Sequence, residues 1–270
     1  STGSRLVVHE TMPMKNPIKS ITCLAILLLL IPDSLRAEEG CADRLEAIDR
    51  ASWDGFGAAV SLSGETAVLG AYGESGGRGA AYVFRLLEGG GWAQEAKLMD
   101  PEANANDNFG WFVSVEGSSA LVGSYLDDRS LLNSGSATIW NRQPNATWSM
   151  GSRLAPDDPV QNHYFGNSVS LSGDLAAVSA FGDDTGGQNA GSVYLFRRSA
   201  EGAWSQEAKL LGPDQTTGDA FGYSVSVSGN RVLVGSAFDD VNGVTNAGSA
   251  WIFERDGVGD WTPVTQLFRN

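Results

Sequence analysis

Short segments of alternating or uniformly apolar residues recur along most of this chain, and they have the lengths of β-strands. Residues 223–227 (Tyr-Ser-Val-Ser-Val) alternate polar and apolar side chains, which predicts a strand with one wetter and one drier face. Residues 232–234 (Val-Leu-Val) are uniformly apolar, which is typical of a strand buried on both faces. Ser-Gly pairs such as Ser228-Gly229 separate such segments, because glycine accepts the positive φ of tight hairpin turns. No amphipathic stretch is long enough to favour an α/β fold.

The same arrangement of segments occurs four times. Each copy begins with a Phe-Gly pair and continues through a small residue 14 positions later, a Gly-Ala or Gly-Ser pair, an apolar run that ends in an aromatic residue, and a tryptophan six positions before a leucine. The pairs are Phe56-Gly57, Phe109-Gly110, Phe165-Gly166 and Phe221-Gly222. The tryptophans are Trp92, Trp148, Trp204 and Trp261. Length varies only in a middle acidic loop, so this loop is expected at the surface.

Each copy therefore predicts four short strands, and four strands at this period suit one blade of a β-propeller. The fold class expected is all-β: a β-propeller of four-stranded antiparallel blades, with a complete and an incomplete ring as the two alternatives. The pattern, seen most fully in residues 221–229 and 234–240, resembles the FG-GAP repeat of integrin α-subunit propellers and many bacterial surface proteins. The resemblance covers residues 54–270, divided at about 54–106, 107–162, 163–218 and 219–270.

The segment before the first repeat, residues 38–53, holds Leu45 eleven residues before Phe56, which matches the leucine spacing of the other copies. It could supply a closing strand, yet the chain also ends in its own fourth strand at residues 261–267. The resemblance implies seven blades, and four copies fall short of that. We therefore expect either a truncated sequence or assembly with another copy, through open blade edges that leave strand edges unpaired.

The N-terminal region resembles an export signal. Residues 1–13 precede the expected start, and residues 14–37 combine a basic beginning, an apolar core over residues 21–31 and a small residue at Ala37. That core is too short to span a bilayer, so an exported protein (secreted, periplasmic or at the cell surface) without a membrane span after cleavage is expected, with an uncleaved anchor as the alternative. Cys23 would leave with the signal. Cys41 would then have no intramolecular partner, and it could pair between molecules or stay buried.

The charge argues against nucleic acid as a partner. The formal net charge is -14, and since residues 1–37 contain four Lys/Arg and two Asp/Glu, the remainder carries -14 - 2 = -16. Phosphate binding needs a basic patch, which this composition does not offer. A hydrophobic fraction of 42% is enough for a globular core.

The acidic loops are the candidate metal sites. Adjacent aspartates occupy one position of three copies, and asparagines follow them. The candidate metal ligands are Asp127, Asp128, Asp183, Asp184, Asp239, Asp240 and Asn242. Carboxylate and amide oxygens in a Gly-rich loop suit calcium. The resemblance implies calcium loops of the form Asp-x-Asp-x-Asp-Gly-x-x-Asp, however, and that spacing does not occur here. The alternative is that these aspartates cap turns through their own backbone, so calcium is the one cofactor left open.

Other recurring polar and aromatic positions favour structural roles. Asp54, Asp107 and Asp219 precede three of the Phe-Gly pairs, and His163 stands at that position in the third copy; a hydrogen bond to a neighbouring strand is expected of them. No Gly-x-Ser-x-Gly motif accompanies His163, so a serine hydrolase is not indicated. The four repeated tryptophans could stack on sugar rings, but packing between blades is the more common use of such residues.

What the resemblance implies is a non-enzymatic binding or adhesion module that takes a protein or glycan ligand on its loops. A carbohydrate-binding lectin and a hydrolase on a propeller scaffold remain the alternatives, since paired carboxylates of a glycosidase are recognised only by their distance. Fold alone does not supply a ligand.

Overall fold

The computed structural model describes residues 44–268. The expected signal segment at 14–37, Cys23 and Cys41 lie outside the described residues. Among the residues that are described, no helix is long and apolar enough to cross a membrane.

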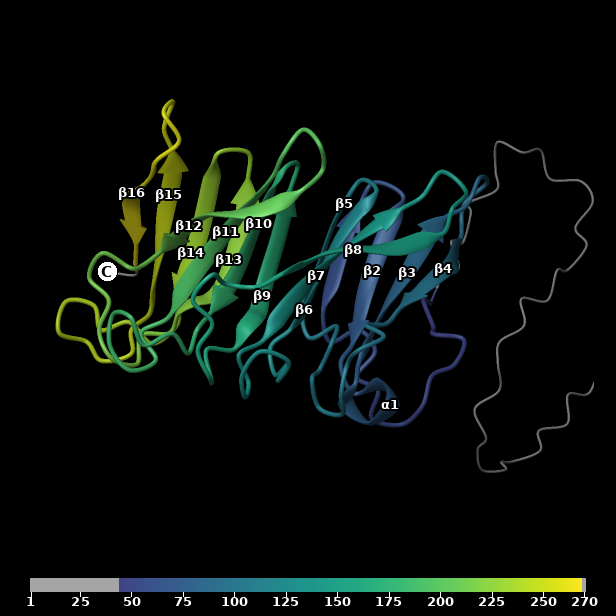
Figure 1. Ribbon diagram of the computed structural model, residues 1–270, viewed down its shortest axis with the longest axis horizontal. Helices are drawn as coiled ribbons and strands as arrows, with labels where there is room; N and C mark the ends of the chain where they lie inside the picture. Colours follow the sequence, from purple (N-terminus) through teal and green to yellow (C-terminus); the bar gives the residue numbers. More distant parts are fainter. Residues whose placement is uncertain (1–43, 269–270) are drawn as a thin grey trace, which may run out of the picture. The chain divides into compact units, whose positions relative to one another are not determined.

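Within residues 44–268, sixteen strands form four separate antiparallel sheets of four strands each (Figure 1). The first sheet contains β1 (Val60–Ser63), β2 (Thr66–Ala71), β3 (Ala80–Leu86) and β4 (Trp92–Leu98). The second contains β5 (Val113–Glu116), β6 (Ser119–Ser124), β7 (Ser136–Arg142) and β8 (Trp148–Leu154). The third contains β9 (Phe165–Ser172), β10 (Leu175–Ala180), β11 (Ser192–Arg198) and β12 (Trp204–Leu210). The fourth contains β13 (Phe221–Ser228), β14 (Arg231–Ser236), β15 (Ser249–Arg255) and β16 (Trp261–Leu267).

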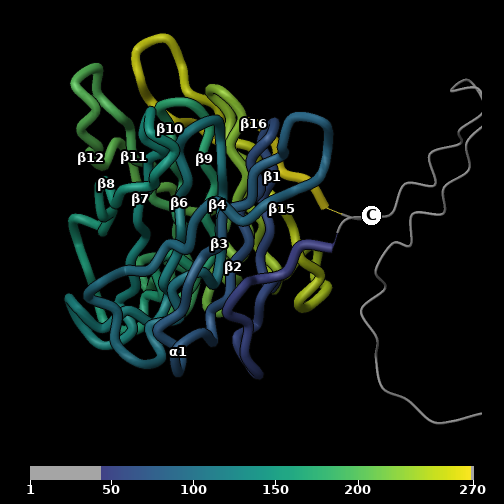
Figure 2. Tube along the Cα trace, turned by 90° about the vertical axis from the view of Figure 1, so that its right-hand side faces the viewer, coloured from purple at the N-terminus to yellow at the C-terminus, as the bar shows by residue number. Residues whose placement is uncertain are grey.

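Within each sheet the strands pair in chain order, so each repeat is one blade. The predicted fold class, four blades of a β-propeller, is confirmed. Because all blades repeat the same strand order, the loops that join second to third strands lie at one end of the blades, the end where the short helix α1 (Glu74–Gly77) lies in both views (Figures 1 and 2). These are the acidic loops of the sequence.

The hydrophobic cores lie between neighbouring blades. One core joins Val68, Val83 and Leu98 of the first blade to Phe109 and Val122 of the second. Two further cores join the second blade to the third and the third to the fourth in the same way. The Phe of each Phe-Gly pair from the second blade on is fully buried in such a core. Stacking one blade on the next is therefore what buries the apolar residues of this fold.

The Phe-Gly pair also connects blades through the backbone. A parallel bridge pairs Phe109 with Gly79, and the two following blades repeat it as Phe165 with Gly135 and Phe221 with Gly191. A Cβ atom at Gly79 would lie 1.9 Å from the carbonyl oxygen of Phe109. Only glycine allows this approach, which explains the glycine directly before the third strand in each of the first three blades.

The two ends of the row of blades are exposed. Val60 and Leu62 on β1 are 68% and 67% exposed, and Leu233 on β14 is 41% exposed. The prediction that residues 232–234 are buried on both faces is wrong for Leu233, because no further blade of the described chain covers that face. Residues 44–47 form no strand, and Leu45 packs with Ala47 and Phe56 against the first blade.

Candidate functional site

The first aspartate of each acidic pair is buried and bonded within its own blade. Asp127 accepts hydrogen bonds from the Arg129 amide at 2.8 Å and from the Ser136 hydroxyl at 2.6 Å. Asp183 accepts the same two bonds from the Thr185 amide and the Ser192 hydroxyl, both at 2.8 Å. In the fourth blade Asp239 accepts a bond from the Ser249 hydroxyl. These carboxylates fix the loop to the start of the third strand.

The second aspartate of each pair is exposed and closes the loop from outside. Asp128, Asp184 and Asp240 accept hydrogen bonds from the amides of Asn133, Asn189 and Asn246 at 2.6, 2.7 and 2.7 Å. These asparagines have positive φ angles, and so does Asn242 at +52°. Asparagine tolerates that conformation better than most residues, so its recurrence in these loops has a backbone explanation.

Lysine and arginine side chains of the protein already neutralise some carboxylates of the acidic loops. Lys209 Nζ lies 2.8 Å from Asp183, and an Arg129 nitrogen lies 3.5 Å from Asp127. Burial opposes ionisation of Asp183, but the bonds from Lys209 and Thr185 outweigh it and hold the pKa of Asp183 below its ordinary value. The fourth blade has Gln266 where the third has Lys209, and there burial raises the pKa of Asp239.

The loops therefore place their carboxylates differently from a calcium loop. Within residues 44–268, no group of three or more His, Cys, Asp or Glu side chains is arranged to hold a metal ion. Each pair also points one carboxylate into the blade and the other outward. Calcium binding by these residues stays a prediction, and the geometry favours turn capping.

The acidic residues before the Phe-Gly pairs have the structural role that the sequence predicts, with a different partner. Asp54 accepts the amide of Ala51 and Asp107 accepts that of Asn104, both at 2.6 Å. The bond therefore closes the aspartate's own turn rather than joining a neighbouring strand. His163, at the same position of the third blade, is 4% exposed, and its Nδ1 lies 3.8 Å from Asp183.

Two of the four repeated tryptophans, Trp148 and Trp261, donate a hydrogen bond to the preceding blade. The indole nitrogen of Trp148 donates to Glu95 of the preceding blade at 2.7 Å, and Arg142 donates to both oxygens of the same carboxylate at 2.8 and 2.7 Å. Arg142 holds the pKa of Glu95 below its ordinary value. Trp261 and Arg255 bond to Glu207 in the same manner, and we call this arrangement the Glu-Arg-Trp clamp. The geometry favours the packing role of these tryptophans over sugar stacking.

A different set of aromatic residues forms a continuous row across all four blades. We call it the aromatic row, and neighbouring ring centroids along it lie 4.6 to 6.5 Å apart. Its members, in order, are Tyr72, Trp111, Tyr125, Tyr164, Phe181, Tyr223 and Phe238. The first five are half-buried, and the last two are 49% and 46% exposed.

Four members of the aromatic row line a recess of about 620 Å³. Tyr125, Tyr164, Phe181 and Phe238 provide its aromatic surface, and Asn189 adds polar atoms. Tyr164 and Phe181 are stacked with centroids 5.0 Å apart and planes 11° apart. Tyr164 has a φ of +56°, a strained conformation for an aromatic residue. A recess of apolar rings with a few polar groups is a common form of ligand site.

The aromatic row escapes the sequence pattern because its members come from different repeat positions. Tyr72, Tyr125 and Phe181 stand 16 residues after their Phe, and this recurrence is visible in the sequence. Trp111 and Tyr223 stand two residues after it, Phe238 stands 17 residues after it, and Tyr164 directly precedes it. Only the stacking of blades brings these positions into one line.

Comparison with known proteins agrees with the repeat architecture. The model of the FG-GAP repeat family matches residues 42–84, 92–139, 148–196 and 204–253. The fold is similar to the crystal structure of a protein from Lactobacillus plantarum, with a TM-score of 0.51 at 14% sequence identity. That match covers 78% of this chain and 55% of the other, so this chain spans about half the length of that protein. No curated protein matches the sequence.

Proposed function

This chain belongs to the FG-GAP repeat family, and its four described blades have the fold of β-propeller blades. On this basis we propose that it is a non-enzymatic binding module. The ligand is a protein or a glycan, and it lies along the aromatic row. The observation that carries this proposal is the continuity of seven rings over four blades. An extended ligand can contact several rings at once.

The exposure of the row supports binding over packing. Rings that serve the cores of this fold, such as Phe109, Phe165 and Phe221, are 0% exposed. Tyr125, Tyr164 and Phe181 stay only half-buried although their blades have a neighbouring blade on each side. Half-exposed aromatic residues provide contact area at low cost in conformational entropy, and they are enriched where proteins bind ligands. The strained backbone of Tyr164 in the recess points the same way.

The cellular setting is part of the proposal. Residues 14–37 have the pattern of an export signal, and this supports the proposal that the module works outside the cytoplasm, as a secreted, periplasmic or cell-surface protein engaged in adhesion. The exposed carboxylates Asp128, Asp184 and Asp240 belong to the acidic loops, and Asn189 of one such loop lines the recess, so ligands with hydroxyl or cationic groups are favoured.

The test is binding of the purified chain to a glycan array and to a peptide array. Phe181→Ala and Tyr125→Ala should each weaken any specific binding about tenfold, the effect of losing one well-packed aromatic contact. Trp53→Ala is the matched control, because Trp53 is 94% exposed and lies outside the row. Binding that both row variants retain in full would contradict the proposed site. Turnover of an array glycan would favour the hydrolase alternative.

A further inference from the structure

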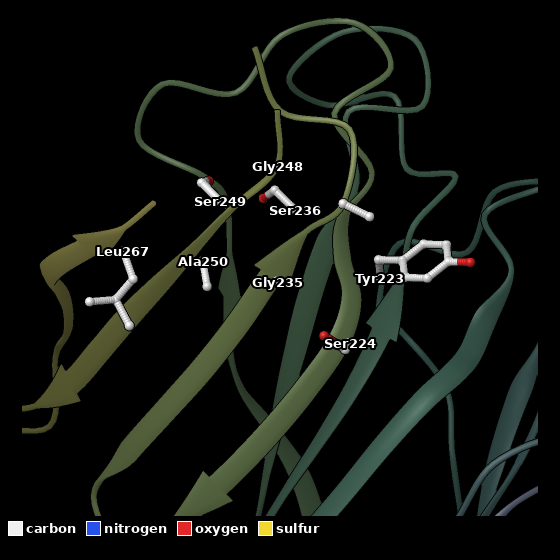
Figure 3. Close-up of a pocket in the computed structure, with 9 residues that line it drawn as sticks. Tyr223, Ser224, Gly235, Ser236, Gly248, Ser249, Ala250 and Leu267 are labelled. Carbon is white, nitrogen blue, oxygen red and sulfur yellow. The ribbon is translucent and has the colours of Figure 1, made fainter. Parts of the chain in front are cut away.

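The outer face of the fourth blade carries an unfilled groove of about 370 Å³. Figure 3 shows its residues: Ser224 comes from β13, Gly235 from β14, Ala250 from β15 and Leu267 from β16, and Gly248 directly precedes β15. The groove crosses all four strands of the blade. We call it the open groove.

In the preceding blades, the next Phe-Gly pair fills the equivalent place. A Cβ at Gly135 would lie 2.0 Å from the carbonyl oxygen of Phe165, and one at Gly191 would lie 2.1 Å from that of Phe221. At Gly248 the nearest atom is the Ala237 carbonyl oxygen of the same blade, at 3.2 Å. The open groove therefore has the form of a seat for a fifth Phe-Gly pair.

A ladder of serine hydroxyls also marks the docking direction. Ser168 and Ser170 of β9 accept hydrogen bonds from the amides of Val225 and Val227 of β13 at 3.1 and 3.0 Å. Ser61 of β1 accepts the amide of Val115 at 3.0 Å in the same way. On β13 the corresponding residues are Ser224, Ser226 and Ser228, and all three are exposed. They can accept the amides of a further innermost strand.

The first blade, at the opposite end of the row of blades, presents the matching strand β1. Phe56 of the first blade is only half-buried, whereas its three counterparts are fully buried. Val60 and Leu62 on β1 stand at the repeat positions of Val225 and Val227, and both are highly exposed. Their amides occupy the donor positions of the serine ladder.

The residues at the positions of the Glu-Arg-Trp clamp differ in the first and last blades, and the two differences complement each other. At the clamp position of the last blade, Val264 stands at the strand bulge where Glu95 and Glu207 stand in other blades. On the first blade, Leu86 replaces the arginine of the clamp. Val264 and Leu86 are 49% and 36% exposed. A glutamate at position 264 or an arginine at position 86 alone would be an unpaired charge where the two ends meet. Valine and leucine instead form an apolar pair there.

We propose that the open groove receives the β1 face of a second copy of this chain, so that two chains associate head to tail. Phe56 of the second copy fills the groove, the amides of its Val60 and Leu62 donate to Ser224 and Ser226, and its Leu86 packs on Val264. The contact continues the blade stacking that occurs three times within one chain. A heterologous contact of this kind forms a closed ring if the rotations between copies add up to a full turn, and otherwise it forms an open filament. Two copies of the four described blades would give eight blades, within the usual range of propellers.

The test is the mass of the full chain in solution, measured by light scattering with a thiol reductant so that Cys41 cannot link molecules. Twice the mass of one chain is expected. Val264→Glu and Leu86→Arg should each weaken dimerisation about tenfold or more, because each places an unpaired charge in an apolar contact. The double variant should recover dimerisation by forming the Glu-Arg pair seen between Glu95 and Arg142. Val258→Glu, in the exposed turn between β15 and β16, is the matched control and should dimerise as the unmodified chain does.

A monomeric mass up to the highest soluble concentration would overturn the proposal, including the case in which another part of the chain covers the groove. A dimer that tolerates Val264→Glu and Leu86→Arg as well as Val258→Glu would also overturn it, since its contact would lie elsewhere. A series of masses that grows with concentration would support the head-to-tail contact and overturn the closed ring of two.

Discussion

The ammonium nitrogen of Lys209 lies 2.8 Å from a carboxylate oxygen of Asp183, and this ion pair joins the fourth strand of the third blade to its acidic loop. Lys209 also lies 2.7 Å from Asp158, in the segment that joins the second blade to the third. Lys97 of the first blade makes two comparable contacts, with Glu74 and Asp49. A cation at this repeat position thus connects three segments of chain, and the fourth blade lacks it.

Asp183→Asn should lower the free energy of unfolding at pH 7 by about 2 kcal/mol, because it removes a buried charge partner of Lys209. The pKa of Asp183 is lowered by folding, so its contribution is present above the ordinary carboxyl pKa of about 4 and is lost as the pH falls further. Urea denaturation of both proteins from pH 7 to pH 3 measures this. A stability difference that stays constant across that range would contradict the assignment.

Asp239→Asn is expected to behave in the opposite way. Burial raises the pKa of Asp239, so its ionisation in the folded state costs stability as the pH rises through the folded pKa. The variant should be as stable as the unmodified protein at pH 4 and more stable by up to about 1 kcal/mol at pH 7. The same urea titrations test it. A loss of stability at pH 7 would show that the Asp239 charge has a partner comparable to Lys209.

Glu95→Gln should destabilise the contact between the first and second blades by about 1 to 2 kcal/mol, since it weakens a bidentate pair with Arg142 and a bond from Trp148. Glu254→Gln is the matched control: it weakens the pair with Arg231, whose side chain is 65% exposed, and should change stability by less than about 0.5 kcal/mol. Equal losses in the two variants would contradict the clamp.

Gly135→Ala should reduce the unfolding free energy by about 3 kcal/mol or more, because the new methyl group would lie 2.0 Å from the Phe165 carbonyl and the backbone has a φ of +80°. Gly173→Ala separates the two causes. Gly173 also has a positive φ of +61°, but a Cβ there would meet no atom within 4 Å. It should cost only about 1 kcal/mol. Thermal and urea unfolding of both variants provide the comparison.

Calcium addition and chelation should leave the melting temperature unchanged, because protein groups already bond the loop carboxylates. A calcium-dependent rise that Asp184→Asn together with Asp240→Asn abolishes would instead establish calcium loops, since saturating ligand at 100 times its dissociation constant adds about 2.7 kcal/mol. Magnesium at the same ionic strength controls for general screening of the acidic surface.

The sequence by itself determined the four repeats and the four strands of each. These features repeat at nearly constant offsets, and strand period, hairpin glycines and buried aromatic residues are properties of short segments. The Phe-Gly pairs and the tryptophan positions could be read without knowing how one copy contacts the next.

Tertiary structure alone decided the surroundings of these residues. The sequence shows Asp183 and Asp239 as equivalents, but their pKa values shift in opposite directions because a strand some 26 residues later supplies Lys209 to one and Gln266 to the other. The aromatic row combines four different repeat positions, so no single offset reveals it. Burial of Leu233 depends on a neighbouring blade rather than on its own segment. Contacts between blades join residues more than 50 positions apart, as Val115 and Ser61 show, and short-range patterns carry no information about them.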